Sequence, residues 1–452
     1  MLIFDTICAL ATPPYPSALA LIRLSGEKTL DILSHIIKKD VTTLEPNRSY
    51  FVKIYPDKEK ESDPIDEVVL TFYKGPKSYT GFDSVDFSTH GSMIVVEELL
   101  DTLCKYGARR AEKGEFSAQS YYNGKMDLLK AQGINDLINA QSKRAKEIAT
   151  KTLSGKNTKI VTELKNTLLG YLAQLEYFVE NQYDDTESDD YIQVLDEIHD
   201  NLEKDIVHVD QLLEKTKRAN KEYRGFHVAI AGEPNVGKST LLNAILQEDK
   251  AIVSPIPGTT RDVVEGIKEI RGIRFHFKDT AGLRKTDDYV ENLGIERSYQ
   301  TMEAADLILL CSDCGFQDME NNRVLQELLS HKNVIKVATK KDLDYRSTTE
   351  DIAICSLNDD LKNLYDLLFC KLDLNQKEES SFLGKREEDY LAKILEEMKK
   401  ARDAILDTYQ VDIISDTLRV SVALINDLMG QHVGKTMEDI YQTLFSKFCL
   451  GK

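Results

Sequence analysis

The segment that most constrains the fold is 232–240, whose sequence GEPNVGKST fits the pattern GxxxxGK[ST]. An apolar, strand-like run precedes it at 226–231, and a helix-forming run follows at 241–246. This context predicts a phosphate-binding loop, in which backbone N–H groups surround an anion at a helix N-terminus, and it disfavours a chance glycine turn. Within the loop, Lys238 is expected to reach the β- and γ-phosphates and Ser239 to bind Mg²⁺.

Composition places the chain among globular proteins of several domains. It has 452 residues, of which 42% are apolar and 30% charged, so about three domains are expected. No apolar run approaches the length of a membrane span, and the first residues lack the features of a secretory signal. Seven scattered cysteines suit a reducing compartment, so we expect a cytoplasmic protein with no membrane contact.

The net charge of −18 argues against a protein that coats nucleic acid through bulk charge. A local basic face or a basic partner could still serve an RNA substrate. The basic residues of 215–224 favour a solvated linker over an RNA contact. The acidic segment 183–190 favours a loop over a metal site. Cys311 and Cys314 form a CxxC, but they follow the apolar run 307–310, so a strand end is favoured over a redox pair.

The order of apolar patterns predicts a multidomain α/β protein. Residues 1–118 are mixed α and β, with strands expected near 18–24 and 67–73, and the pattern from Met126 is helical for about ninety residues. Residues 216–376 alternate strands and helices, as in a doubly wound, mostly parallel sheet. Helices resume through 387–407 and 417–428. Segments 119–215 and 377–452 are therefore expected to form one helical domain, interrupted by a nucleotide domain.

Two segments downstream of the loop carry the residues that a nucleotide triphosphatase needs. The sequence PGTTRD at 257–262 supplies a threonine that can complete the Mg²⁺ shell, as a first switch segment does. The sequence DTAG at 279–282 follows a strand, with Asp279 in a Walker-B-type position and Gly282 free to turn its N–H toward the γ-phosphate.

Base recognition is expected from Thr339, Lys340 and Asp342, where guanine-binding GTPases usually carry Asn-Lys-x-Asp. Asp342 can accept from guanine N1 and N2, and the stem of Lys340 can cover the ring. Thr339 lacks the amide that would bridge to the base and back to the phosphate loop. A preference for guanine is still expected, but this substitution leaves the affinity for guanine open. The last guanine loop is expected at Ser356-Leu357-Asn358.

Ras-type proteins place a catalytic glutamine directly after the Asp-x-x-Gly element, but this chain has Leu283 there, and a leucine cannot orient water. Catalysis must therefore use another residue. Asn235 and the oxygens of 254–259 could chelate a monovalent cation in place of an arginine finger. Glu291 is the candidate for orienting water, the alternative being a surface carboxylate. The predicted catalytic set is Glu291, Lys238 and Asn235. The predicted GTP contacts are Asn235, Val236, Gly237, Lys238, Ser239, Thr240, Ser254, Pro255, Ile256, Pro257, Gly258, Thr259, Thr260, Asp279, Thr280, Ala281, Gly282, Thr339, Lys340, Asp342, Ser356, Leu357 and Asn358.

Several sequence blocks along the chain match one protein family. They are Asp5-Thr6 with Ala11-Thr12-Pro13-Pro14, Ile22-Arg23-Leu24-Ser25-Gly26, Ser78-Tyr79-Thr80-Gly81, Gly114-Glu115-Phe116-Ser117, Lys125-Met126-Asp127-Leu128, Gly258-Thr259-Thr260-Arg261-Asp262, Gly294-Ile295-Glu296-Arg297 and Phe448-Cys449-Leu450-Gly451-Lys452. Through these blocks the chain resembles, from end to end, the bacterial tRNA-modification GTPase family MnmE, also called TrmE. GTPases similar to Era share the nucleotide motifs but not the N-terminal blocks or the tail.

The resemblance implies an N-terminal tetrahydrofolate-binding-like domain that also dimerises, a helical domain and an inserted Ras-like GTPase domain. It implies a K⁺-dependent homodimer, activated when two GTPase domains meet. With the flavoprotein MnmG, in a heterotetramer, it would add a carboxymethylaminomethyl-type group to the wobble uridine of certain tRNAs. The carbon would come from methylene-tetrahydrofolate, and the implied folate cofactor is 5,10-methylene-tetrahydrofolate or 5-formyl-tetrahydrofolate.

The resemblance also implies ligands by position. Asn235, Ser254, Ile256 and Thr259 would hold K⁺, and Ser239 and Thr260 would hold Mg²⁺. Arg23, Asp86, Lys125 and Lys452 would face the folate, with Asp86 standing where a glutamate is usual. Phe82 and Ser92 also depart from the family pattern near this site. Cys449 would lie near the same site, where a packed thiol is favoured over a nucleophile.

Two functions of different classes follow. The first is a dimeric, cation-dependent GTPase whose switch movements gate tRNA modification. The second is an Era-like regulatory switch that binds RNA or a ribosomal particle without chemistry of its own. Folate binding by the N-terminal part discriminates between them.

Overall fold

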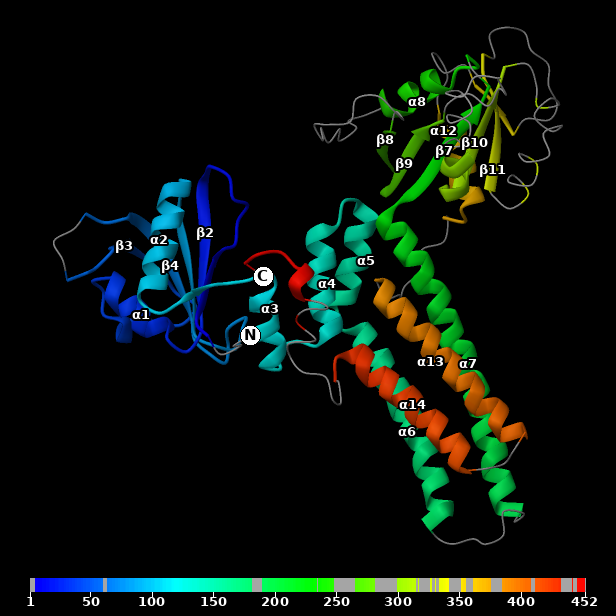
Figure 1. Cartoon of the computed structure of the whole chain (residues 1–452), viewed down its shortest axis with the longest axis horizontal. Coiled ribbons are helices and arrows are strands. Elements are labelled where there is room, and N and C mark those ends of the chain that lie inside the picture. The colour runs from blue at the N-terminus through cyan, green and yellow to red at the C-terminus, as the bar shows by residue number, and fades with distance from the viewer. Residues whose placement is uncertain are drawn as a thin grey trace. The chain divides into compact units, whose positions relative to one another are not determined.

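The computed structural model describes most of the chain, and Figure 1 shows its elements. The described residues are 5–59, 63–180, 189–233, 235–247, 265–280, 299–313, 316, 326, 330, 333–340, 351–354, 361–374, 384–407, 411–431, 441 and 445–451. None of the helices in these ranges combines the length and the apolarity that crossing a bilayer requires.

The N-terminal part contains a six-stranded sheet in the order β3-β4-β5-β2-β1-β6. Its strands are antiparallel except for the parallel pair of β1 and β6. The strands are β1 (Ile7–Leu10), β2 (Ser17–Ser25), β3 (Ser49–Ile54), β4 (Asp66–Tyr73), β5 (Ser84–Gly91) and β6 (Arg109–Arg110). The mixed α and β content predicted for residues 1–118 is therefore confirmed.

Buried and half-buried residues alternate along the strands and show which face of this sheet the helices cover. In β2, Ala20, Ile22 and Leu24 are buried and belong to one apolar core with residues of α1 (Thr29–Ile36) and α2 (Met93–Lys105). Leu21 and Arg23 alternate with them and point to the other face. Arg23 is therefore placed on the face opposite the two helices.

Long helices follow the N-terminal sheet, as predicted. They are α3 (Glu115–Tyr122), α4 (Leu128–Asn139), α5 (Lys143–Leu153), α6 (Lys156–Glu180), α7 (Asp189–Arg224), α13 (Lys385–Asp407) and α14 (Val411–Met429). Helices α6 and α14, far apart in the sequence, pack side by side (Figure 1). Short 3₁₀ helices span Val41–Thr43 and Phe445–Lys447.

The interpretation of 215–224 as a linker is wrong. These residues form the last turns of α7, which continues to Arg224 and is followed at Phe226 by β7. Lys217 pairs with Glu214, and Lys221 lies 3.6 Å from Asp306. These ion pairs offset part of the positive charge of the segment, and the alternative of an RNA contact stays a prediction. The predicted acidic loop 183–190 is wrong at its end, because Asp189 and Asp190 form the first turn of α7, and residues 183–188 lie outside the described residues.

A second six-stranded sheet has the order β12-β11-β10-β7-β9-β8, and all its pairs are parallel except β8 with β9. The strands are β7 (Phe226–Gly232), β8 (Glu265–Ile270), β9 (Ile273–Asp279), β10 (Leu307–Ser312), β11 (Asn333–Ala338) and β12 (Ile352–Ala353). Helices α8 (Lys238–Gln247) and α12 (Lys362–Lys371) belong to the same part. The predicted doubly wound, mostly parallel sheet is confirmed.

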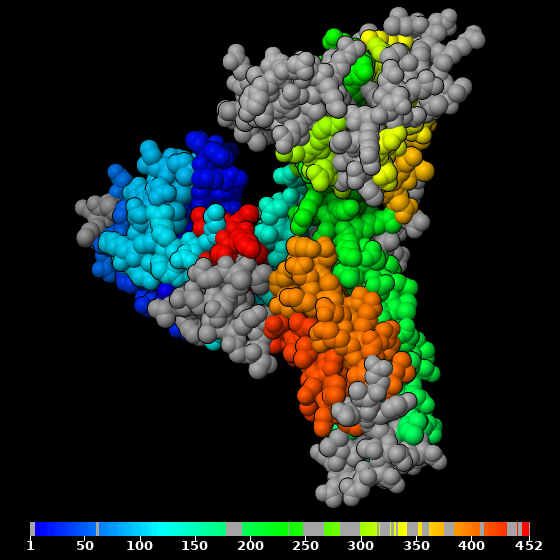
Figure 2. Space-filling model, turned by 45° about the vertical axis from the view of Figure 1, so that its right-hand side comes forward, coloured from blue at the N-terminus to red at the C-terminus, as the bar shows by residue number. Residues whose placement is uncertain are grey.

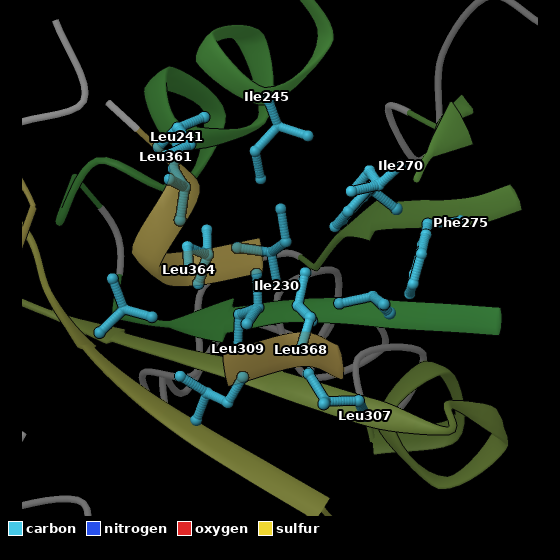
Figure 3. Packing of buried hydrophobic residues seen from close by; sticks show 14 of the residues in the cluster. Ile230, Leu241, Ile245, Ile270, Phe275, Leu307, Leu309, Leu361, Leu364 and Leu368 are labelled. Atoms are coloured by element: carbon cyan, nitrogen blue, oxygen red, sulfur yellow. The ribbon is translucent and has the colours of Figure 1, made fainter. Parts of the chain in front are cut away.

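Both faces of this sheet are buried, which explains its continuous apolar strands. Ile230 and Leu309 pack with Leu241 of α8 and Leu364 of α12 in one core (Figure 3). The residues that point to the opposite face from β7 and β10 form a smaller core with Met302; they are Ala229, Ala231, Ile308 and Leu310.

Contacts divide the chain into two compact units, one of residues 1–135, 153–199 and 396–452 and the other of residues 136–152 and 200–395. The predicted boundaries at 118, 215 and 376 stay a prediction.

A buried ion pair joins two helices within the second unit. Arg144 of α5 donates from Nε to Glu222 of α7 at 2.6 Å, and the two side chains are 13% and 4% exposed. The backbone N–H of Arg144 also donates to the carbonyl of Gly272, in the turn between β8 and β9, at 2.9 Å. The hairpin that precedes Asp279 is thus fastened to α5.

We expect Arg144→Ala to lower the free energy of unfolding of this unit by roughly 2 to 4 kcal/mol, because the buried Glu222 carboxylate then keeps, among the described residues, the more distant Arg218 at 3.5 Å as its charged partner. Urea denaturation followed by circular dichroism measures the change. The control is Arg48→Ala, which removes a pair with Glu45 whose side chains are 61% and 67% exposed. Equal stability losses in the two variants would contradict the role given to Arg144.

Candidate nucleotide-binding site

The loop 232–237 connects β7 to α8, which begins at Lys238. Gly232 has φ +153°, and a Cβ there would collide with the carbonyl oxygen of Cys311 in the neighbouring strand. Asn235 and Gly237 also have positive φ, at 66° and 102°. The glycines therefore allow a tight loop against the carboxyl ends of two parallel strands, where ligands bind in open α/β sheets.

Lys238 lies inside this loop. Its ammonium donates to the carbonyl oxygens of Gly232 at 3.1 Å and Glu233 at 2.7 Å, and the residue is only 7% exposed. Burial lowers the pKa of Lys238 below its ordinary value, and the nearby Asp279 carboxylate opposes this shift. A bound phosphate would supply further negative charge to this cation.

Ser239 and Asp279 form the part of the site that fits a divalent cation. The Ser239 hydroxyl donates to Oδ2 of Asp279 at 2.7 Å. Among the described residues, Oδ1 of Asp279 is buried and has no hydrogen-bond partner. Hard oxygen ligands with an unsatisfied carboxylate oxygen suit Mg²⁺. Thr280 is held beside them, since its N–H and hydroxyl both bond to the carbonyl of Ile230 at 3.1 and 3.0 Å.

The expectation for Thr339 is corrected in one respect. Its hydroxyl donates to the carbonyl oxygen of Val236 in the phosphate loop, so the bridge to that loop is retained without an amide. The neighbouring Lys340 has φ 55°, and its ammonium contacts Asp313 at 2.6 Å. Because they follow β11 directly, Thr339 and Lys340 lie at the same edge of the sheet as the phosphate loop.

Cys311 is fully buried in β10, and burial raises the pKa of its thiol to about 12. Such a thiol is a packing residue with little thiolate at neutral pH, which supports the strand-end interpretation. Cys314 lies outside the described residues.

The structure brings part of the predicted nucleotide site together. Asn235, Val236, Gly237, Lys238, Ser239 and Thr240 form the loop and the helix start, with Asp279, Thr280, Thr339 and Lys340 around them. The other predicted contacts lie outside the described residues. They are Ser254, Pro255, Ile256, Pro257, Gly258, Thr259, Thr260, Ala281, Gly282, Glu291, Asp342, Ser356, Leu357 and Asn358.

In the first unit, Arg23 and Asp86 form the centre of the predicted folate site. They face each other across β2 and β5 and make two hydrogen bonds, of 2.8 and 3.0 Å. Both side chains are mostly buried, at 17% and 14% exposure. Lys125 is exposed after α3, and the structure describes no side-chain contact between it and this pair. Lys452 lies outside the described residues.

The C-terminal segment packs against α3 and α4 of the same unit, beside the N-terminal sheet (Figure 2). Gly114 has φ 72°, and any side chain there would collide with the carbonyl of Phe445. The Tyr441 hydroxyl donates to the carbonyl of Lys113 at 2.8 Å. Arg23 lies 3.5 Å from the Gly451 carbonyl, and the half-buried Cys449 is two residues before it. The tail therefore reaches the Arg23–Asp86 pair.

Two aromatic residues of this site were missed by reasoning from the sequence. The Arg23 guanidinium lies 5.8 Å from the ring centre of Tyr79 and 5.9 Å from that of Phe116. Tyr79 also shares a hydrogen bond of 3.0 Å with Ser117. Both rings fall in blocks that carry the family resemblance, and this was the available signal.

Comparison with known proteins identifies the family of both parts of the chain. The family model "GTP-binding protein TrmE N-terminus" matches residues 6–125, and "50S ribosome-binding GTPase" matches residues 227–340. Full-length relatives described as "tRNA modification GTPase MnmE" come from Fervidobacterium nodosum, Mycoplasma mycoides subsp. mycoides and Aquifex aeolicus. Each is 35% identical to this chain, with alignments that cover 99%, 100% and 99% of it and 98%, 100% and 100% of the relative.

The chain thus has a TrmE-type N-terminal domain and a Ras-like P-loop GTPase domain. With this similarity over its whole length, it belongs to the tRNA modification GTPase MnmE family.

Proposed function

We propose that this protein is a GTP hydrolase that acts in tRNA modification. The observation that carries the proposal is the joint position of Lys238, Ser239 and Asp279 at the carboxyl end of the second sheet. These residues supply one cation and two oxygen ligands around a loop of backbone N–H groups, which suits a nucleotide triphosphate with Mg²⁺. Relatives described as tRNA modification GTPases match from end to end and support the same activity.

The chain's own groups would act mainly by positioning and by charge. Lys238 would orient the β- and γ-phosphates, and Ser239, Thr260 and Asp279 would hold Mg²⁺, which neutralises charge that develops on the phosphate oxygens. Glu291 would orient the attacking water. Leu283, at the position after the Asp-x-x-Gly element, has no side-chain amide for that task.

A monovalent cation is part of the proposal. Asn235, Ser254, Ile256 and Thr259 would hold K⁺ beside the phosphates, where an arginine finger would otherwise supply positive charge. Asn235 occupies the exposed part of the phosphate loop, with the left-handed backbone noted above, which supports its role as a ligand on the rim of the site.

We expect GTP turnover to be about tenfold or more faster in K⁺ than in Na⁺, and Asn235→Ala to remove this difference. Steady-state phosphate release at equal ionic strength measures both effects. The matched control is Asn47→Ala, at another residue with positive φ, in the N-terminal domain. Equal rates in the two salts would contradict the cation's role, and no turnover in either would contradict the GTPase activity.

We further propose that the N-terminal domain binds a tetrahydrofolate carbon donor. Arg23 and Asp86 supply a guanidinium and a carboxylate, and Tyr79 and Phe116 supply ring faces beside them. Such a combination suits a flat heteroaromatic ring with hydrogen-bonding edges. Lys125, Lys452 and the tail with Cys449 would complete this site.

We expect 5-formyl-tetrahydrofolate to bind the full chain, and Arg23→Ala to weaken binding by about tenfold or more, since a charge-assisted hydrogen bond is lost. Isothermal titration calorimetry measures the affinity. Arg48→Ala is the control, because that arginine lies on the exposed surface of the same domain. Intact GTP turnover without folate binding by the wild type would favour the Era-like switch over the modification enzyme.

The proposed assembly is a homodimer formed through the N-terminal domain, with MnmG as a further partner in a heterotetramer. Phe51 and Val69 face each other across β3 and β4 and are 72% and 43% exposed. Paired apolar side chains in the open on a sheet are typical of a surface that a second subunit covers. The proposed domains are 1–118, the helical pair 119–215 and 377–452, and the GTPase domain 216–376, in a cytoplasmic protein.

The tRNA substrate is tested in cells. We expect cells that lack this chain to lose the carboxymethylaminomethyl-type group from wobble uridines, since no other step of the proposed reaction would supply its carbon. Mass spectrometry of nucleosides from purified tRNA measures the group. Wild-type protein should restore it, whereas Lys238→Ala should not, because its phosphate loop lacks the cation. Unchanged wobble uridines in the deleted cells would contradict the proposed substrate.

A further inference from the structure

Two cysteines, one in the N-terminal sheet and one in a helix that covers it, lie side by side. Cys8 belongs to β1 and Cys104 to the last turn of α2, and their sulfur atoms are 3.9 Å apart. The two residues are 96 positions apart in the sequence, so the fold of this part brings them together. Since a disulfide bond is about 2.05 Å long, a movement of roughly 2 Å, within the range of side-chain rotation, would allow the two sulfur atoms to bond.

The surrounding structure keeps the two thiols together. Cys8 is fully buried in the core that α2 shares with the sheet, to which Leu103 of that helix also belongs. On the outside of α2, Arg110 of β6 donates to Glu97 at 2.9 Å and to Asp101 at 2.7 Å. Because Arg110 is the partner of Cys8 in the parallel pair of β1 and β6, these ion pairs hold α2 against the same part of the sheet. The two thiols therefore meet at a high effective concentration.

The two thiols differ in their access to solvent. Cys8 has no exposed surface, whereas Cys104 is half-buried, so an oxidant in solution meets Cys104 first. Burial, with the neighbouring Cys104 thiol as a further cause, raises the pKa of Cys8 well above its ordinary value. Cys8 is therefore a neutral thiol at neutral pH and is protected from direct oxidation. The pair thus combines an outer thiol that can be oxidised with an inner thiol that can resolve the oxidised product.

We propose that Cys8 and Cys104 form a redox modification site, which closes reversibly to a disulfide when the protein meets a peroxide. The Cys104 sulfur attacks one oxygen of hydrogen peroxide and becomes a sulfenic acid, and the other oxygen leaves with the thiol proton as water. The Cys8 sulfur then attacks the Cys104 sulfur, and the sulfenic hydroxyl leaves with the Cys8 proton as water. Two thiols are thus oxidised to one disulfide, and one peroxide is reduced to two water molecules. A dithiol reverses the reaction by thiol–disulfide exchange.

The disulfide would join two ends of the N-terminal domain. The chain between the two cysteines contains β2 to β5 and α1, so the cross-link would close a loop around most of the sheet. A cross-link over so long a loop restricts the unfolded chain and stabilises the folded one. In a reducing compartment such a pair rests as two thiols and is oxidised only transiently. Oxidation would therefore make the packing of α2 on the sheet more resistant to opening.

The test treats the full-length protein with hydrogen peroxide, alkylates the remaining thiols and maps the peptides by mass spectrometry without reduction. The wild type should yield two peptides joined through Cys8 and Cys104, and dithiothreitol should separate them. Amide hydrogen exchange in α2 should slow by about tenfold or more in the oxidised protein, because the cross-link opposes the local opening of this helix. Absence of the joined peptides, or unchanged exchange in α2 when they are present, would overturn the inference.

Three variants separate the roles of the two thiols. Cys8→Ala removes the resolving thiol, so the Cys104 sulfenic acid should be oxidised further to a sulfinic acid, which the wild type avoids. Cys104→Ala should leave Cys8 reduced, because burial protects it. Cys370→Ser is the control, since that exposed cysteine lies in α12 of the other unit, and the joined peptides should still form. Equally fast formation of sulfinic acid at Cys104 in the wild type and in Cys8→Ala would contradict the resolving role, and oxidation of Cys8 in Cys104→Ala would contradict the proposed order of attack.

Discussion

The nucleotide site depends on the close approach of β7 and β10 where these parallel strands end. Gly232 lies so near the Cys311 carbonyl that no side chain fits between them, and this contact sets the path of the loop that follows. The loop then places Lys238 among its own carbonyl oxygens and starts α8 beside Asp279. A sheet buried on both faces makes this approach possible, because its apolar strands pack tightly on each side.

Much of this arrangement could be predicted from the sequence, since it rests on local patterns. The phosphate loop, the parallel strands and the C-terminal helices can each be identified from a motif or an apolar periodicity within one short segment. The linker interpretation of 215–224 failed because charge alone does not distinguish a loop from a solvated helix surface. The apolar residues that continue α7, among them Leu212 and Ala219, were the better guide.

Contacts between distant segments could not be predicted in the same way. The hydroxyl of Thr339 makes the hydrogen bond to the phosphate loop that an asparagine amide would otherwise make, because the Val236 carbonyl lies within its reach. The sequence motif gives no information about the distance between these two residues. Tyr79 and Phe116 come from two segments that meet only around Arg23. For the N-terminal unit, the family resemblance therefore named Arg23 and Asp86, but neither their ion pair nor the two aromatic rings beside Arg23 could be predicted.

The contact between the C-terminal segment and Arg23 also determines the order in which parts of the protein can fold during synthesis. Arg23 and the Gly451 carbonyl are 428 residues apart in the chain. At about 5 to 20 residues per second, a ribosome needs roughly 20 to 90 s to synthesise the intervening residues. The N-terminal sheet and its helices can fold in that interval, but the surface around Gly114 stays exposed to solvent until the ribosome has released the C-terminal residues from Tyr441 onward, which cover it. The two candidate sites are thus completed one after the other, because the nucleotide domain is synthesised before the C-terminal segment covers the surroundings of Arg23.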